Sequence, residues 1–271
     1  MPHSQTSLLS ICLILILYLL QGLSLGIITS MPIFLSTHGA TWKDQTTFNF
    51  VYYPFSFKLL WAPLIDAIYS VRFGRRKSWL MPIQLSLAAI FILLSFYVES
   101  FINTGRIVLL SMIFFVAIFL VASQDICVDG LAITLFTSTN PQWASTAQQL
   151  GQPIGRLLGF SFLLIFESAN FTNKYIRTPL SLPHQTSGLF SFEQFIRWTG
   201  VACFIVTISI AIFFHEKKES EDITKLSLGE TYISMWKLLK KTCIRQLILI
   251  SLLSPIGLVA IQFMTRVTLI T

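Results

Sequence analysis

Long apolar runs separated by short polar stretches dominate this chain of 271 residues. Runs of about 20 apolar residues recur along its length, and a helix of that length crosses the hydrocarbon layer of a bilayer, which is ~30 Å thick. The short alternation of apolar and polar positions that is typical of membrane β-strands is not seen in the sequence. The pattern therefore predicts an all-α fold, a polytopic transmembrane helical bundle.

Seven runs are long enough to be predicted as membrane spans. In chain order they cover residues 8–28, 48–69, 79–98, 107–130, 144–166, 195–214 and 244–270. Pro54 and Pro63 should kink the second span, because each proline removes a backbone donor. The spans group into a six-helix bundle at residues 1–214 and the first helix of a second half at residues 244–271.

The segment between these two parts, residues 215–243, is predicted to be a charged cytosolic loop. It is the most charged part of the chain and ends in an amphipathic stretch at residues 232–241. A basic amphipathic helix beside a span is typical of segments that lie in the membrane interface. We therefore expect an interfacial helix there.

Composition and charge support this assignment. Hydrophobic residues make up 54% of the chain and charged residues 11%, against roughly a quarter charged in soluble domains. The net charge of +7 lies mostly in two loops, so membrane orientation explains it and no nucleic-acid partner is expected. Because Lys and Arg gather in cytosolic loops, their distribution predicts a cytosolic N-terminus. The sequon that begins at Asn170 would then be lumenal, where it can be glycosylated.

The sequence contains no pattern typical of an enzyme or of a cofactor site. Its four cysteines show no CxxC or Cys/His spacing, which disfavours a metal site. It has no nucleophile–base spacing and no Walker loop, so transport by this chain would use gradients or exchange instead of ATP.

Polar side chains inside the apolar runs are the candidates for chemistry, because charges in lipid are costly and mark a site, a salt bridge or a gate. The predicted substrate-binding set is Lys58 in the second span, Gln124, Asp125 and Asp129 in the fourth, and Gln148, Gln152 and Arg156 in the fifth. The two aspartates lie four residues apart and share a helix face. That face is suited to bind a cation, to relay a proton or to pair with Lys58 or Arg156, and the sequence leaves these alternatives open.

The two cations of this set, Lys58 and Arg156, are interpreted as groups that attract an anionic substrate into a water-filled cavity. A guanidinium can hold a phosphate through two parallel hydrogen bonds. The alternative for Lys58 is a purely structural ion pair.

A gating latch is predicted where the second span ends, at Asp66 together with Arg75, Arg76 and Lys77. An aspartate at the end of one helix can pair with guanidinium groups beyond the turn in one transport state and release them in another. The alternative is that the basic cluster only anchors this loop on the cytosolic side.

Glycines recur every four residues in two of the spans. Gly22 and Gly26 lie in the first span, and Gly151, Gly155 and Gly159 lie in the fifth. Such steps are typical of helices that pack closely in membranes.

Three blocks of the sequence resemble the acetyl-coenzyme A transporters of the endoplasmic reticulum membrane, a family of the major facilitator superfamily. They are FSFKLLWAPLIDAIYSVRFGRRKSWLMPIQ at residues 55–84, ASQDICVDGLAITL at 122–135 and STAQQLGQPIGRLLGF at 145–160. The resemblance implies twelve helices in two six-helix halves around a midplane cavity. The chain would then be truncated to one half plus a seventh helix.

The resemblance also implies a function. The protein would be a multi-pass protein of the endoplasmic reticulum membrane that imports cytosolic acetyl-CoA into the lumen, where it feeds acetylation. Its partners would be acetyl-CoA, the lipid bilayer and either a second copy or a full-length relative, with no cofactor.

Three alternatives stay open. Bacterial muropeptide permeases share a similar pattern at residues 58–66 and a similar basic turn. A degenerate half could be a non-transporting interaction protein. A seven-helix receptor would place its N-terminus outside, which reverses the charge distribution. The spacing from Asp66 to Gly74 is also longer than in the general superfamily loop.

Overall fold

The structure is a computed structural model, and it describes residues 3–70, 73–136, 142–214, 228–251 and 253. No β-strand occurs among these residues, and most of them are helical. They belong to two compact units that divide between residues 220 and 221.

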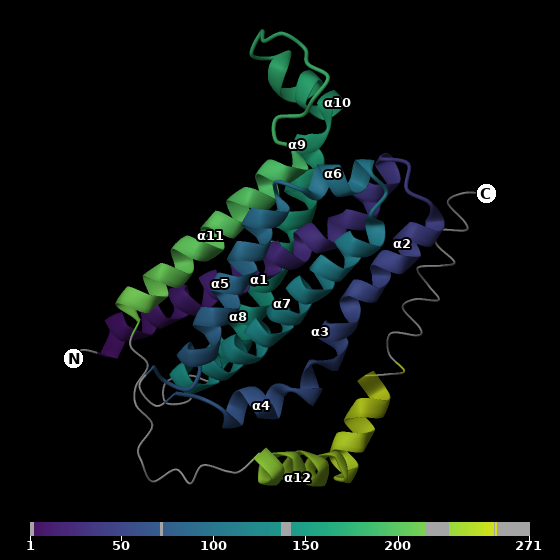
Figure 1. The fold of residues 1–271 in the computed structure, drawn as a ribbon. Helices are drawn as coiled ribbons and strands as arrows, with labels where there is room; N and C mark the ends of the chain where they lie inside the picture. The colour runs from purple at the N-terminus through teal and green to yellow at the C-terminus, as the bar shows by residue number, and fades with distance from the viewer. Residues whose placement is uncertain (1–2, 71–72, 137–141, 215–227, 252, 254–271) are drawn as a thin grey trace. The chain divides into compact units, whose positions relative to one another are not determined.

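Four helices in the described part of the first unit are long and apolar enough to cross a membrane. They are α1 (His3–Thr37), α5 (Lys77–Leu94), α7 (Ile107–Phe136) and α11 (Phe192–Phe213), and they match the first, third, fourth and sixth predicted spans (Figure 1). The predicted helical membrane bundle is thus confirmed. The third span ends earlier than predicted, because a short helix, α6 (Val98–Asn103), follows α5.

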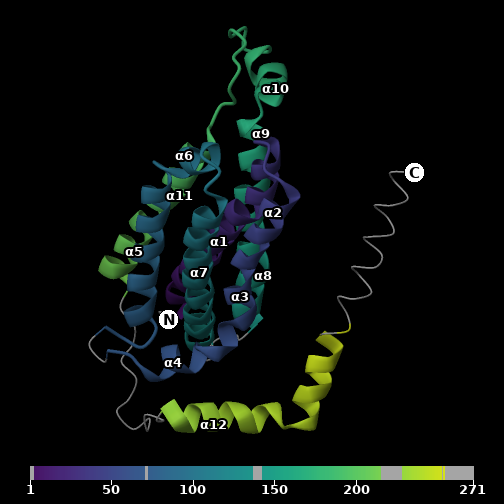
Figure 2. The ribbon, with the colours of Figure 1, turned by 45° about the vertical axis from the view of Figure 1, so that its right-hand side comes forward.

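The fifth predicted span is a helix with a bent extension. It consists of α8 (Gln142–Leu157), a π-helical turn η3 (Leu158–Phe162) and α9 (Leu163–Glu167). Beyond Glu167 the chain bends by 75° into α10 (Ala169–Thr172) and η4 (Asn173–Arg177). In both ribbon views α10 projects beyond the ends of α1 and α7 (Figures 1 and 2).

The second predicted span is not one helix. It is divided into α2 (Trp42–Asn49), η1 (Phe50–Tyr52), α3 (Tyr53–Phe57), η2 (Lys58–Leu60) and α4 (Ala62–Ala67). Pro54 and Pro63 each lie in the first turn of a short helix, where the missing backbone donor needs no partner. The breaks predicted from the two prolines are confirmed.

α2 begins at a capping box. Thr41 accepts a hydrogen bond from the backbone of Asp44, and the Asp44 carboxylate accepts from the backbone of Thr41. The hydrogen bonds from Thr41 hold the pKa of the exposed Asp44 carboxyl below its usual value. This cap fixes where the chain turns back towards the bundle after α1.

The core of the first unit has a polar layer between two hydrophobic clusters. Along α1, one cluster contains Ile14 and Leu17, and the other begins at Leu25. Along the antiparallel α7 the order is reversed, with one cluster ending at Val121 and the other beginning at Cys127. The buried polar side chains between the clusters are Gln21, Ser24, Gln84, Ser123, Gln124, Asp125 and Thr207. Polar groups therefore meet near the middle of the bundle, away from both ends.

Glycines bring α1 and α8 into backbone contact. A Cβ atom on Gly22 would lie 2.1 Å from the carbonyl oxygen of Gln152, and one on Gly155 would lie 2.1 Å from that of Leu19. Only hydrogen atoms fit at these positions, so any larger residue would force the helices apart. The close packing predicted from the glycine steps is confirmed. α5 and α11 form the other long contact of the unit (Figure 2).

The second unit contains α12 (Leu228–Leu239) and a short apolar helix, Thr242–Ser251. None of the residues of α12 is buried. The predicted interfacial stretch at 232–241 coincides largely with α12. Most of the seventh predicted span lies outside the described residues.

Replacing Gly155 with Ala tests the contact between α1 and α8. We expect the midpoint of thermal unfolding in detergent to fall, since overpacking of a close contact costs about 1–3 kcal/mol. Gly229→Ala in α12 is the matched control, because a Cβ atom there meets no other atom within 4 Å. Equal midpoints for Gly155→Ala and the wild type would contradict the contact.

Candidate functional site

An ion pair between Lys58 and Asp125 lies in the polar layer. Lys58 begins η2, where the second span is broken, and Asp125 lies in α7. The Lys58 side chain is 33% exposed and that of Asp125 only 1%. Gln21 of α1 donates a hydrogen bond to the other oxygen of Asp125. The carboxylate is therefore buried but satisfied by one cation and one amide, from two different segments.

Asp129 lies one turn further along α7 and has different partners. Its Oδ1 accepts hydrogen bonds from the Tyr18 hydroxyl at 2.6 Å and from the Gln148 amide at 3.0 Å. Tyr18 comes from α1 and Gln148 from α8, so this carboxylate connects three helices. Among the described residues, none makes an ion pair with it.

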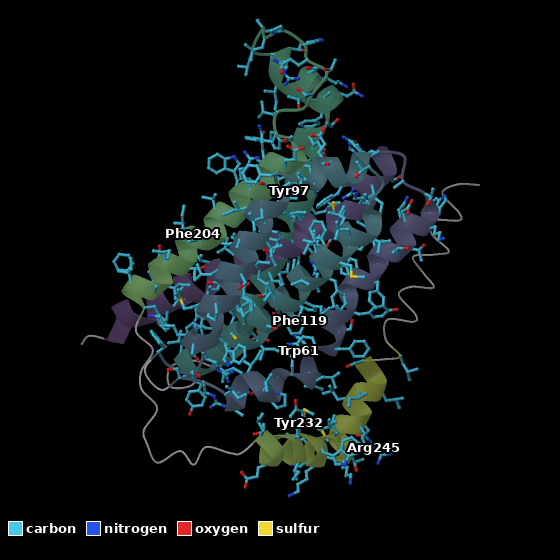
Figure 3. The ribbon with its side chains drawn as sticks, in the orientation of Figure 1. Trp61, Tyr97, Phe119, Phe204, Tyr232 and Arg245 are labelled. Atoms are coloured by element: carbon cyan, nitrogen blue, oxygen red, sulfur yellow. The ribbon has the colours of Figure 1, made fainter. Side chains whose placement is uncertain are left out.

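Aromatic side chains surround the ion pair. The Lys58 ammonium lies 4.9 Å from the centre of the Phe55 ring. Trp61 donates a hydrogen bond of 3.1 Å to the Ser123 hydroxyl, and its ring lies 4.8 Å from that of Phe119 between ring centres (Figure 3). Trp61 thus connects the broken second span to α7 beside Asp125.

Arg156 is placed differently from Lys58. Its side chain is exposed, and none of the described residues gives it a hydrogen bond or an ion pair. It lies near enough to the Tyr52 phenol for an electrostatic interaction. The pairing alternative therefore holds for Lys58, whereas the guanidinium of Arg156 stays available to an external anion.

The remaining glutamines of the predicted set are Gln152 and Gln124. Gln152 is half-buried beside Arg156 and makes no side-chain hydrogen bond in the described part of the chain. Gln124 is 2% exposed, and its Oε1 atom has no partner among the described residues.

The predicted latch residues meet at the end of the bundle where α5 begins. Arg76 forms an ion pair with Asp66, and the Nε of Arg75 donates to the backbone oxygen of Asp66 at 3.1 Å. The Arg76 guanidinium also occupies the space over Gly130 of α7, 2.3 Å from where a Cβ atom would be. Lys77 instead donates to backbone oxygens in the last turn of α11, including that of Ala211 at 3.0 Å. Asp66 and Arg76 thus connect the second span, the basic turn and α7.

The sequon lies in α10. Asn170 is exposed there, while Thr172 is buried and donates a hydrogen bond of 2.8 Å to the backbone oxygen of Ser168.

Sequence reasoning missed Tyr18 and Gln21, the two side chains of α1 that bind the aspartates. A signal for Gln21 was present, because an amide inside an apolar run is costly in lipid without a partner. Tyr18 gave no such signal, since a tyrosine in an apolar run is ordinary. Its role depends on the approach of α1 to α7.

Helices of membrane length that enclose an ion pair and buried amides define a multi-pass membrane protein with a polar site in its core. Residues 10–224 match the family model described as acetyl-coenzyme A transporter 1, and the chain therefore belongs to this family.

Curated relatives agree with this placement. The chain is 32% identical over 263 residues to an uncharacterized protein of Schizosaccharomyces pombe, covering 94% of this chain and 48% of the relative. It is 32% identical over 234 residues to an uncharacterized membrane protein of Saccharomyces cerevisiae, covering 79% and 41%. It is also 32% identical over 152 residues to AmpG 4 of Rickettsia conorii, which is named as a candidate transporter, covering 54% and 35%. The chain spans less than half the length of these relatives, and no solved structure matches it.

Replacing Lys58 with Met tests the ion pair. The change leaves the Asp125 carboxylate buried without its cation, which should destabilise the protein by about 3–5 kcal/mol. The double variant Lys58→Met, Asp125→Asn should regain most of this loss, because Asn still accepts the hydrogen bond from Gln21. Thermal unfolding in detergent measures both. A single variant as stable as the wild type would contradict the pairing.

Proposed function

We propose that this chain forms part of a secondary transporter that moves acetyl-CoA from the cytosol into the lumen of the endoplasmic reticulum, where it feeds acetylation. The proposal rests on the family match together with one observation. The guanidinium of Arg156 lies in a membrane span, is exposed, and makes no hydrogen bond or ion pair with any described residue. A CoA thioester carries several phosphate charges, and a guanidinium binds phosphate through charge-assisted hydrogen bonds.

The proposed substrate site extends from Arg156 to the polar layer. Gln152, half-buried beside Arg156, and Gln148, one turn before it, offer amides to the polar groups of the substrate. Lys58 contributes the second cation, and its side chain is 33% exposed. Asp125 holds Lys58 in place, and Asp129 and Gln124 complete the set on α7.

The latch residues are proposed to gate this site. The ion pair between Asp66 and Arg76 closes one end of the bundle between the second span and α7. Release of Arg76 from Asp66 and from the space over Gly130 would let these segments separate. Arg75 and Lys77 would support the latch by holding the turn to Asp66 and to α11.

α12 is proposed to lie in the membrane interface on the cytosolic side. Its exposed side chains include Tyr232, Ile233 and Trp236, and Lys237 lies in its last turn. Aromatic and basic residues on a short amphipathic helix suit the headgroup region of a bilayer.

Two other functions are the alternatives to acetyl-CoA transport. The similarity to AmpG 4 over half of this chain favours a transporter, and a permease for a different polar solute, such as a muropeptide, is the first alternative. A non-transporting protein that pairs with a second copy or a full-length relative is the second. Uptake of labelled acetyl-CoA by the complete protein in proteoliposomes separates acetyl-CoA transport from both.

Replacing Arg156 with Gln tests the substrate site in that assay. Loss of a charge-assisted hydrogen bond costs about 2 kcal/mol, which corresponds to roughly a thirty-fold rise in the apparent KM for acetyl-CoA. Arg106→Gln is the matched control, since Arg106 is an exposed arginine in the turn before α7. An unchanged KM for Arg156→Gln would remove the proposed role of Arg156.

Replacing Asn170 with Gln tests the proposed lumenal side and the cytosolic N-terminus. In cells with a secretory pathway, we expect the wild type to carry an endoglycosidase-sensitive glycan that the variant lacks. Asn103→Gln, at an exposed asparagine outside any sequon, should keep the glycan. A wild type without a glycan would count against the lumenal placement of Asn170.

A further inference from the structure

The charges of the polar layer do not balance. Asp125 and Asp129 lie one turn apart on the same face of α7. Among the described residues, the cation that contacts this pair is Lys58, and it binds Asp125. Asp129 is therefore partly buried in the bundle beside a second carboxylate, and it has no ion-pair partner among the described residues. A carboxylate that is partly withdrawn from water and has no cation beside it tends to be neutralised by taking up a proton.

The hydrogen bonds of Asp129 leave one oxygen available. Tyr18 and Gln148 both donate to Oδ1, at 2.6 and 3.0 Å. Oδ2 accepts no hydrogen bond from the rest of the described chain. A proton can bind to Oδ2 without breaking either existing hydrogen bond, because both donors still find an acceptor in Oδ1.

The described elements next to Asp129 each contribute a polar or charged side chain. α1 contributes Tyr18, α8 contributes Gln148 and α7 itself contributes Asp125. Lys58 of η2 acts on Asp129 electrostatically while it pairs with Asp125. Arg76 packs over the adjacent Gly130 but pairs with Asp66. Thus no cation in the described part of the chain forms an ion pair with Asp129.

We propose that Asp129 is a proton-binding site that couples transport to a proton gradient, an inference that rests on the transport function proposed above. In one conformation the Asp129 carboxylate takes up a proton at Oδ2 from one side of the membrane. In the other conformation the same O–H bond breaks and the proton leaves to the opposite side. One proton is carried per cycle, and no other bond is made or broken.

The geometry also provides a physical link between protonation of Asp129 and binding of the substrate. Gln148 binds Asp129 and lies two turns before Arg156 on α8. The same helix therefore contacts Asp129 and carries the arginine that is proposed to bind the phosphate of the substrate. Protonation weakens the charge-assisted hydrogen bonds to Tyr18 and Gln148. The contact of α7 with α1 and α8 then differs in strength between the two protonation states.

The test uses Asp129→Asn in the complete protein, reconstituted into proteoliposomes. Asn keeps an oxygen that can accept from Tyr18 and Gln148 but cannot take up a proton at neutral pH. Exchange of labelled for unlabelled acetyl-CoA is measured at equal pH, and accumulation is measured with a pH gradient imposed in each direction at zero membrane potential. We expect the gradient to raise wild-type accumulation several-fold in one direction. Asp129→Asn should lose this response, so that its accumulation is the same with the pH gradient and without it, whatever its rate of exchange. Asp44→Asn, at a partly exposed carboxylate in α2, should keep both the exchange and the gradient response.

Two results would overturn the proposal while leaving acetyl-CoA transport intact. One is a full gradient response in Asp129→Asn. The other is a wild type that exchanges acetyl-CoA but whose accumulation no pH gradient raises. Absence of acetyl-CoA exchange in the wild type would instead contradict the proposed function. Infrared spectroscopy of the purified complete protein then tests the protonation of Asp129 independently of transport. A carboxylic acid band that titrates in the wild type and is missing in Asp129→Asn supports the proton site, and its absence from the wild type refutes it.

Discussion

The polar layer depends on how closely α1 and α8 approach each other. Gly22 and Gly155 place each backbone against the carbonyl oxygens of the other helix, with no room for a methyl group. At this separation Tyr18 of α1 and Gln148 of α8 reach the same oxygen of Asp129. If α1 and α8 were further apart, Tyr18 and Gln148 would not both reach Oδ1 of Asp129. The glycines therefore position the polar site without contributing side chains to it.

The two hydrophobic clusters explain why the charges lie where they do. Each cluster fills one end of the bundle, and the middle holds the polar side chains together with a small apolar cluster of Leu20, Ala88 and Cys203. Removed from water, Asp125 needs its partners, and Lys58 and Gln21 supply them from two other segments. Such a buried pair adds little net stability compared with apolar packing.

The two cations at membrane depth have different surroundings. Lys58 is held by a buried carboxylate, while Arg156 is exposed on α8 and makes no hydrogen bond or ion pair with the described residues. The break between Pro54 and Pro63 contributes to this difference, because it places Lys58 at the start of a short 3-10 turn facing α7. A continuous helix would fix the direction of Lys58 by helical spacing alone.

The sequence by itself determined the membrane class and most of the span positions, because these follow from the length of the apolar runs. It also determined the breaks at the prolines and the close glycine contact, because proline and glycine act on the backbone locally. It also pointed to Lys58, Asp125 and Asp66 as costly charges that need a partner. Only the tertiary structure decided that Lys58 pairs with Asp125, that Asp129 has no cation among the described residues, and that Tyr18 and Gln21 belong to the site. Tyr18 and Gln21 lie more than a hundred positions from the aspartates that they bind, and Lys58 lies 67 positions from Asp125. No local pattern records how such distant segments meet.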